Sequence, residues 1–167
     1  MRIPVRARAA AVAVAVGGLL VTSFAMPASA ALTPSVACGK LSATTVKGKT
    51  TTQITQCTPA ALKAGGVSVI AKTPPVGSKK GQLGLVITWN GGKGKTTMAA
   101  GFTVQKTPGN CPAGATRITS AGSVKSSTGA AKAIIKVGEP VTATVCSFLS
   151  GPKSGQNALA PGTKYKL

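Results

Sequence analysis

The chain has 167 residues, with 20 Lys and Arg, a single acidic side chain, no His and a formal net charge of +19. Because Glu139 is the only carboxylate side chain, paired-carboxylate hydrolysis, Ser-His-Asp triads and His-ligated or Asp-held metal sites are excluded. We therefore expect a non-catalytic protein without cofactor or metal, of a length that suits one folded domain.

The first thirty residues have the three parts of an export signal. Three arginines form a basic start, residues 9–26 are almost continuously apolar, and a small-residue Ala-Ser-Ala triplet ends at Ala30. The apolar run is short for a membrane span and Pro27 interrupts its end, which favours cleavage over anchoring. We predict a cleaved secretory signal peptide over residues 1–30, a single mature β-domain over residues 31–167 and no transmembrane segment after cleavage. The mature protein is then expected outside the cytoplasm, secreted or associated with the cell envelope.

Four cysteines that follow an export signal indicate two disulfides. Spacing alone allows three connectivities. The turn sequence Lys-Gly-Lys-Thr-Thr at residues 47–51 predicts a hairpin whose register places Cys38 opposite Cys57, close enough to be bridged. We therefore favour the pairs Cys38–Cys57 and Cys111–Cys146.

The clearest strands lie in the middle of the chain. Apolar side chains at every second position from Leu83 to Trp89, and again from Met98 to Val104, predict two half-buried strands with Trp89 in the core. A two-residue turn at Lys93 would place Trp89 opposite Met98 and Leu83 opposite Val104, with all the apolar side chains on one face.

Further short strands and Gly-, Pro- and Ser-rich loops fill the rest of the chain. The expected strands are residues 66–72, 116–125, 133–137 facing 141–145 across a turn, and 163–167. A loop is expected over residues 150–162, and a turn of helix over residues 59–64. About nine short strands predict an all-β fold, a single antiparallel β-sandwich or barrel cross-linked by two disulfides.

Sixteen Lys and Arg117 follow the predicted signal, with only Glu139 of opposite sign. Such a charge is compatible with a solvated, aggregation-resistant surface, or with adhesion to anionic cell-wall polymers or an acidic lipid surface. Lysines in the two KGKT turns and in one further pair are the candidate polyanion-binding residues: Lys47, Lys49, Lys93, Lys95, Lys79 and Lys80. No groove-reading motif indicates sequence-specific nucleic-acid binding, so any affinity for nucleic acid would depend on phosphate charge and on salt.

The layout of several segments resembles that of small exported, disulfide-bonded β-proteins of actinobacteria. These segments are the Thr-rich hairpin from Cys38 to Cys57, Ile87-Thr88-Trp89, Cys111-Pro112-Ala113-Gly114, Val145-Cys146 and Leu159-Ala160-Pro161-Gly162-Thr163-Lys164. The resemblance supports a secreted β-domain and implies no active site.

Two functions are compatible with these observations. The first is a secreted, non-catalytic domain of the cell envelope or medium that acts by adhesion or by binding a partner. The alternative is an exported barrel that binds a small apolar ligand, with Trp89 and Phe102 lining its cavity.

Overall fold

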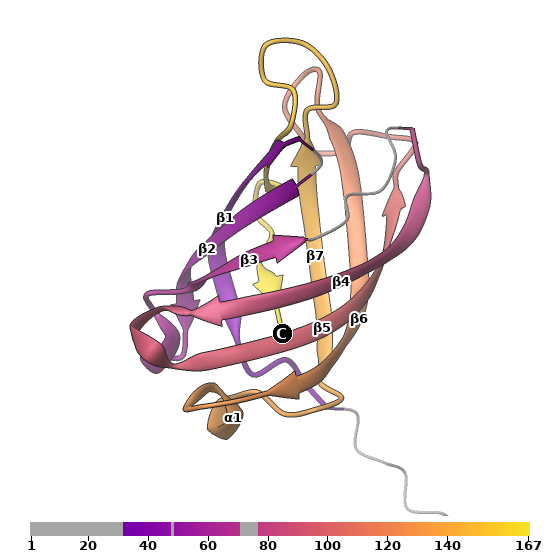
Figure 1. The fold of residues 1–167 in the computed structure, drawn as a ribbon. Coiled ribbons are helices and arrows are strands. Elements are labelled where there is room, and N and C mark those ends of the chain that lie inside the picture. The colour runs from indigo at the N-terminus through magenta and orange to yellow at the C-terminus, as the bar shows by residue number, and fades with distance from the viewer. Residues whose placement is uncertain (1–31, 48, 71–76) are drawn as a thin grey trace, which may run out of the picture. The chain divides into compact units, whose positions relative to one another are not determined.

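The computed structural model describes residues 32–47, 49–70 and 77–167 (Figure 1). The predicted signal peptide, residues 1–30, lies outside the described residues. The described part contains the strands β1 (Ala37–Val46), β2 (Lys49–Thr58), β3 (Gly66–Ile70), β4 (Lys80–Trp89), β5 (Gly94–Val104), β6 (Thr116–Ser127), β7 (Pro140–Ser147), β8 (Gln156–Leu159) and β9 (Tyr165–Lys166). It also contains the 3-10 turns η1 (Ala60–Leu62) and η2 (Asn90–Gly92) and the short helix α1 (Ala131–Ile134).

The strands form an antiparallel barrel. Their order is β2-β3-β4-β5-β6-β7-β8-β1, and β1 pairs with β2 to close the sheet into eight strands, while β9 adds to β1 and β7. The predicted all-β fold is confirmed, as a barrel instead of a sandwich. Alternating apolar side chains cannot distinguish the two, since both bury one face of every strand.

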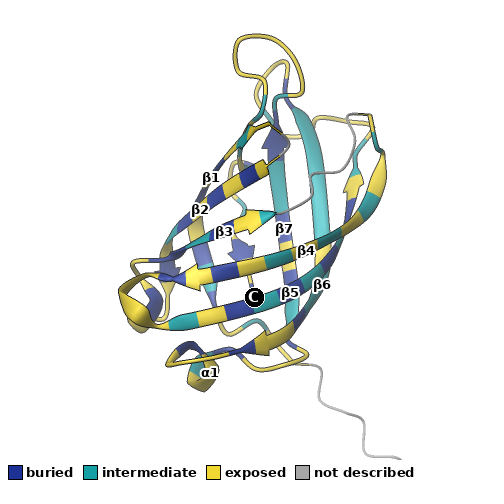
Figure 2. Cartoon of the chain, in the orientation of Figure 1, coloured by how far each residue is buried: buried dark blue, intermediate teal, exposed yellow. Residues whose placement is uncertain are grey.

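Alternation along the strands decides which side chains lie inside (Figure 2). On β2, for example, Thr50, Thr52 and Ile54 are buried, whereas Thr51 and Gln53 are exposed. Such a period of two is what a strand with one solvated face requires.

Large apolar side chains fill the end of the barrel near η2 and α1. Trp89, Met98 and Val124 are at most 2% exposed, and Ile135 beside α1 packs into the same cluster. The indole Nε1 of Trp89 donates a hydrogen bond to Thr96 Oγ1 at 2.8 Å, which satisfies the only polar atom of its side chain. Trp89 is therefore a core residue.

The predicted register of the β4–β5 hairpin is wrong by four residues. Leu85, and not Trp89, lies opposite Met98, and Trp89 lies opposite Gly94. The chain turns earlier than expected because η2 directly follows Trp89 and both of its glycines adopt a positive φ of 69°. An even shift keeps each side chain on its predicted face.

Two other expectations about elements are wrong. Residues 133–137 form no strand, since Ala131–Ile134 are the helix α1, and residues 141–145 pair instead with β6. Ala131 and Ile135 are both fully buried, so one face of this short helix covers the end of the barrel. The expected loop over residues 150–162 contains β8, which pairs with β1 and β7.

The other expected elements are present. The helical turn within residues 59–64 is η1, and the strand expected over residues 116–125 is β6, which continues to Ser127. The last strand, β9, is shorter than expected. Of the strand expected over residues 66–72, the structure describes Gly66–Ile70 as β3, and the last two residues lie outside the described ranges.

Both predicted disulfides are confirmed. Cys38 and Cys57 lie opposite each other on β1 and β2, and Cys111 connects the loop before β6 to Cys146 on the outer face of β7. Two disulfides are typical of proteins in oxidising compartments outside the cytoplasm. None of the helices in the described ranges has the length and apolar character needed to cross a membrane.

The only acidic side chain, Glu139, is buried just before β7. Its Oε2 accepts hydrogen bonds from the Ser35 backbone N–H at 3.1 Å and the Ser35 hydroxyl at 2.6 Å, and its Oε1 accepts one from the Lys136 N–H at 2.8 Å. The carboxylate thus connects the segment before β1 to the segment between α1 and β7. These contacts indicate a structural role for Glu139.

Candidate ligand-binding cavity

The half of the barrel away from α1 contains a cavity of about 440 Å³. Small-molecule sites in proteins have volumes of roughly 300–1,000 Å³. Apolar side chains from several strands form most of its wall, among them Leu41, Leu83, Leu85, Phe102, Ile118 and Val145.

Small residues at inward positions leave this space unfilled. The interior of an eight-stranded barrel is just wide enough for ordinary side chains to fill it. Here Ala43 on β1, Ser68 on β3, Ser120 on β6, and Ala143 and Ser147 on β7 line the cavity. Near η2 and α1 the interior instead contains the large side chains of Trp89, Met98 and Ile135.

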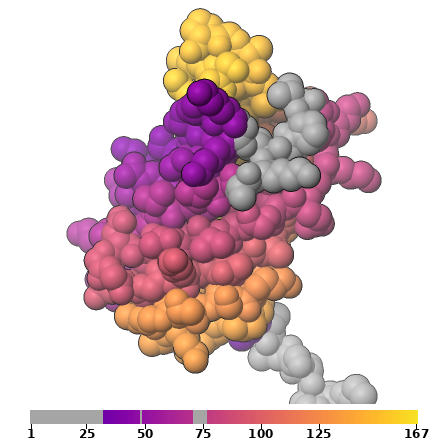
Figure 3. Space-filling model, viewed as in Figure 1, coloured from indigo at the N-terminus to yellow at the C-terminus, as the bar shows by residue number. Residues whose placement is uncertain are grey.

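The cavity opens at the end of the barrel opposite α1. Four exposed lining residues, Gly77, Lys79, Leu149 and Ser154, bound this opening, which we call the mouth. The loop between β7 and β8 projects at the top of Figure 1 and lies beside the end of β1, where the Thr45 N–H donates to the Gly155 carbonyl at 3.0 Å (Figure 3).

Most of the polar side chains that line the cavity carry hydroxyl groups. The hydroxyls of Thr45 and Thr50 are 2.8 Å apart and hydrogen-bond to each other. Ser68 is 3% exposed, and its Oγ has no hydrogen-bond partner in the described structure. A buried hydroxyl without a partner carries an uncompensated desolvation cost, and a ligand with a polar atom at this point of the wall would remove that cost.

Tyr165 forms part of the cavity wall and is itself buried. Its hydroxyl lies 3.5 Å from Met98 Sδ, and burial raises the pKa of the phenol well above its ordinary value. The side chain is therefore neutral at physiological pH. Lys79 is the only charged side chain among the described lining residues.

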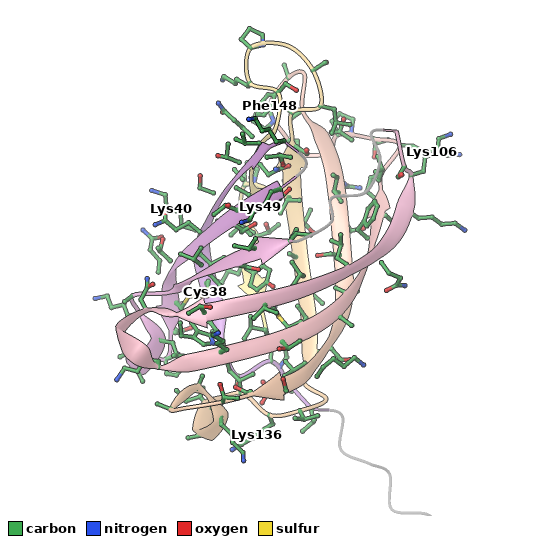
Figure 4. The ribbon with its side chains drawn as sticks, viewed as in Figure 1. Cys38, Lys40, Lys49, Lys106, Lys136 and Phe148 are labelled. Atoms are coloured by element: carbon green, nitrogen blue, oxygen red, sulfur yellow. A yellow bond between two sulfur atoms is a disulfide. The ribbon has the colours of Figure 1, made fainter. Side chains whose placement is uncertain are left out.

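The six candidate polyanion-binding lysines do not form one cluster. Lys47 and Lys49 flank the β1–β2 turn, directly beyond Thr45 and Thr50 of the cavity wall, and Lys79 and Lys80 lie at the start of β4, also at the mouth end. Figure 4 shows Lys49 and Lys106 toward this end and Lys136 at the far one.

Lys93 and Lys95 lie at the other end of the β4–β5 hairpin, where the Lys93 carbonyl accepts a hydrogen bond from the Ala131 N–H of α1. The ten residues of β4, at roughly 3.3 Å each, separate the two groups by about 30 Å. The two KGKT turns are thus on opposite ends of the barrel.

Of the two aromatic residues expected to line a cavity, Phe102 does and Trp89 does not, because Trp89 belongs to the packed end. Sequence reasoning missed Ser68 and Phe148 as lining residues. A polar residue at an inward position of a short strand is the signal that identifies Ser68. Phe148 lies after the end of β7, where alternation gives no guidance, and only the loop geometry places it.

Neither a cluster of metal-binding side chains nor a similarity to known proteins indicates what the cavity binds. Among the residues that the structure describes, there is no group of three or more His, Cys, Asp or Glu side chains that could hold a metal ion. Comparisons with protein-family models, with curated proteins and with solved structures found no match, and they do not bear on the resemblance to exported actinobacterial proteins.

Proposed function

We propose that the protein is a non-catalytic binding protein that holds a small, mainly apolar ligand inside its barrel. The observation that carries this proposal is the cavity of about 440 Å³, open at one end and walled by apolar side chains. Each 100 Å² of apolar ligand surface removed from water contributes about 2.5 kcal/mol to binding. An apolar ligand of matching size thus gains affinity without many polar contacts.

The groups around the cavity support binding without chemistry. Lys79 and Tyr165 are the titratable side chains among its described lining residues, and they come from the mouth and from the interior wall, respectively. Catalysis by proton transfer needs an acid or base of suitable pKa positioned at the reacting atoms. A buried tyrosine with a raised pKa and an exposed lysine do not form such a pair.

The setting of this function is proposed from the sequence and the disulfides together. A cleaved signal over residues 1–30 would deliver the barrel to an oxidising compartment, in which Cys38–Cys57 and Cys111–Cys146 form. The ligand would then be one encountered in the envelope or the medium.

Adhesion to anionic cell-wall polymers or acidic lipid surfaces stays a separate prediction. Its six candidate lysines occupy both ends of the barrel, so adhesion would involve more than one face of the molecule. Retention on isolated cell envelope that falls steadily with the logarithm of salt concentration would support it, and no retention at low salt would contradict it.

The ligand proposal is tested by titrating the mature, oxidised protein with the neutral fluorescent probe N-phenyl-1-naphthylamine. We expect saturable binding at one site. The variant Ala143→Phe directs a large ring into the cavity and should abolish binding, because Ala143 is buried and lines the wall. Its neighbour Thr142 is exposed, so Thr142→Phe is the matched control and should bind like the parent protein.

Absence of saturable binding by the parent protein, or equal binding by the Ala143→Phe variant, would contradict the proposal. Circular dichroism checks that each variant folds. If Ala143→Phe does not fold, Ala43→Leu introduces a smaller side chain into the same cavity and serves as the second variant.

A further inference from the structure

We propose that the ligand is a single-chain amphiphile with an anionic headgroup, its apolar chain inside the barrel and its headgroup at the mouth beside Lys79. This inference rests on the proposed function and adds the charge and the orientation of the ligand. It follows from the contrast between an uncharged interior and a positively charged mouth.

The mouth is surrounded by lysines. Lys79 itself lines the cavity. Lys49 directly precedes the wall residue Thr50 of β2, and Lys47 lies two residues after the wall residue Thr45 of β1. The Nζ of Lys153 lies 5.4 Å from the centre of the Phe148 ring, and Phe148 lines the cavity. Cations at the rim of a cavity with low-dielectric walls attract an anion and orient it.

No carboxylate side chain compensates this charge. Glu139 is the only one in the chain, and it lies before the first residue of β7, whereas the mouth lies beyond the last. The eight residues of β7, at roughly 3.3 Å each, span about 25 Å. Glu139 is also buried and engaged with Ser35 and Lys136. The positive potential of the mouth is therefore available to a ligand.

The interior excludes the charged part of the ligand. Its described wall carries hydroxyl groups, the amide of Asn157 and apolar side chains, and Lys79 at the mouth is its only charged group. Moving an anion away from water without a paired cation is strongly unfavourable. The headgroup must then stay at the mouth, and the part that enters the barrel must be apolar.

An exposed apolar side chain at the mouth fits an amphiphile. Leu149 is 47% exposed and lines the cavity. It can contact the part of the chain that emerges next to the headgroup. A carboxylate and a phosphate headgroup have the same requirement for cations, so the experiment compares the two.

The test compares decanoate, decyl phosphate and decan-1-ol, which share one chain, by displacement of the neutral probe. We expect both anions to bind about tenfold or more tightly than the alcohol at low salt, and this ratio to shrink as salt is raised. Lys79→Gln should reduce the ratio, as should Lys153→Gln. Lys93→Gln, on the opposite end, is the matched control and should leave it unchanged.

The outcomes separate the two proposals. If the alcohol displaces the probe as well as the anions do, the inference is overturned while the binding function stands. If the probe itself does not bind, both are overturned. If Lys93→Gln lowers the ratio as much as Lys79→Gln, the headgroup is not at the mouth. Preference for one anion identifies a carboxylate or a phosphate ligand.

Discussion

Glu139 illustrates what a single carboxylate does in a chain that is otherwise almost free of acidic groups. Removing the side chain by Glu139→Ala leaves the Ser35 N–H, the Ser35 hydroxyl and the Lys136 N–H without their acceptor. We expect a loss of about 2–3 kcal/mol in the free energy of unfolding, because a hydrogen bond to a charged group contributes about 1.5–3 kcal/mol. Urea unfolding of the oxidised protein measures it.

The control for this substitution is Ser35→Ala, which removes one of the three donors and leaves Glu139 its two backbone partners. Its effect should be smaller than that of Glu139→Ala. Parent-like stability of the Glu139→Ala variant would show that the contacts between the segment before β1 and Glu139 are not stabilising.

Tyr165 makes stability depend on pH in the alkaline range. Burial raises the pKa of its phenol above the ordinary value of about 10, so the native state retains a proton that the unfolded chain releases. The resulting contribution is fully present below about pH 10 and is lost as the pH rises further, by about 1.4 kcal/mol per pH unit.

The variant Tyr165→Phe should remove this contribution. Because the lysines titrate in both proteins, the difference between the two unfolding free energies, followed from about pH 8 to about pH 12, isolates the tyrosine. Loss of the contact with Met98 Sδ adds an offset that does not depend on pH. Parallel pH profiles would contradict a buried, neutral Tyr165.

The close approach of β3 and β4 depends on Gly66. A Cβ at this position would lie 2.7 Å from the Thr88 carbonyl oxygen and 2.8 Å from Ile87 Cγ2, closer than packed atoms allow. We expect Gly66→Ala to destabilise the barrel by about 1–3 kcal/mol. Gly84, on β4 itself, has open space around the same atom, so Gly84→Ala is the matched control and should be close to neutral in thermal unfolding. Equal melting temperatures of the two variants would contradict the packing of β3 against β4.

Alternating apolar residues predicted where the strands lie and which side chains point inward better than they predicted which residues pair across strands. The inward set from Leu83 to Trp89 was predictable because apolar residues alternate with exposed ones. The register was not, since the two glycines of η2 place the turn about two residues earlier, which shifts the pairing by four residues, and an even shift leaves every side chain on its predicted face. At α1, apolar residues at alternate positions resemble a strand, and tertiary burial of Ala131 and Ile135 selected a helix.

The cavity is a property of the closed barrel and was only partly predictable. The alternation predicted Trp89 in the core, which is confirmed, while the alternative of a ligand-binding barrel placed both Trp89 and Phe102 at the cavity, where only Phe102 lies. Which half of the interior stays empty depends on where Ser68, Ser120 and Ala143 meet across strands that are far apart in sequence. The division of the lysines between the two ends likewise depends on strand direction, because Lys47 and Lys93 occupy the same turn sequence.

The whole molecule thus combines a packed end, which includes Trp89 and α1, with a hollow end that opens among lysines. Amide and methyl NMR shifts of the mature, oxidised protein, followed during titration with decanoate, test this division most directly. The account predicts saturable shifts for residues that line the cavity, from Lys79 at the mouth to Tyr165 in the wall, and unchanged signals around Lys93. Shifts at Lys79 and Lys93 alike, without changes at Phe102 and Tyr165, would show that the anion binds only to surface lysines and would contradict a ligand inside the barrel.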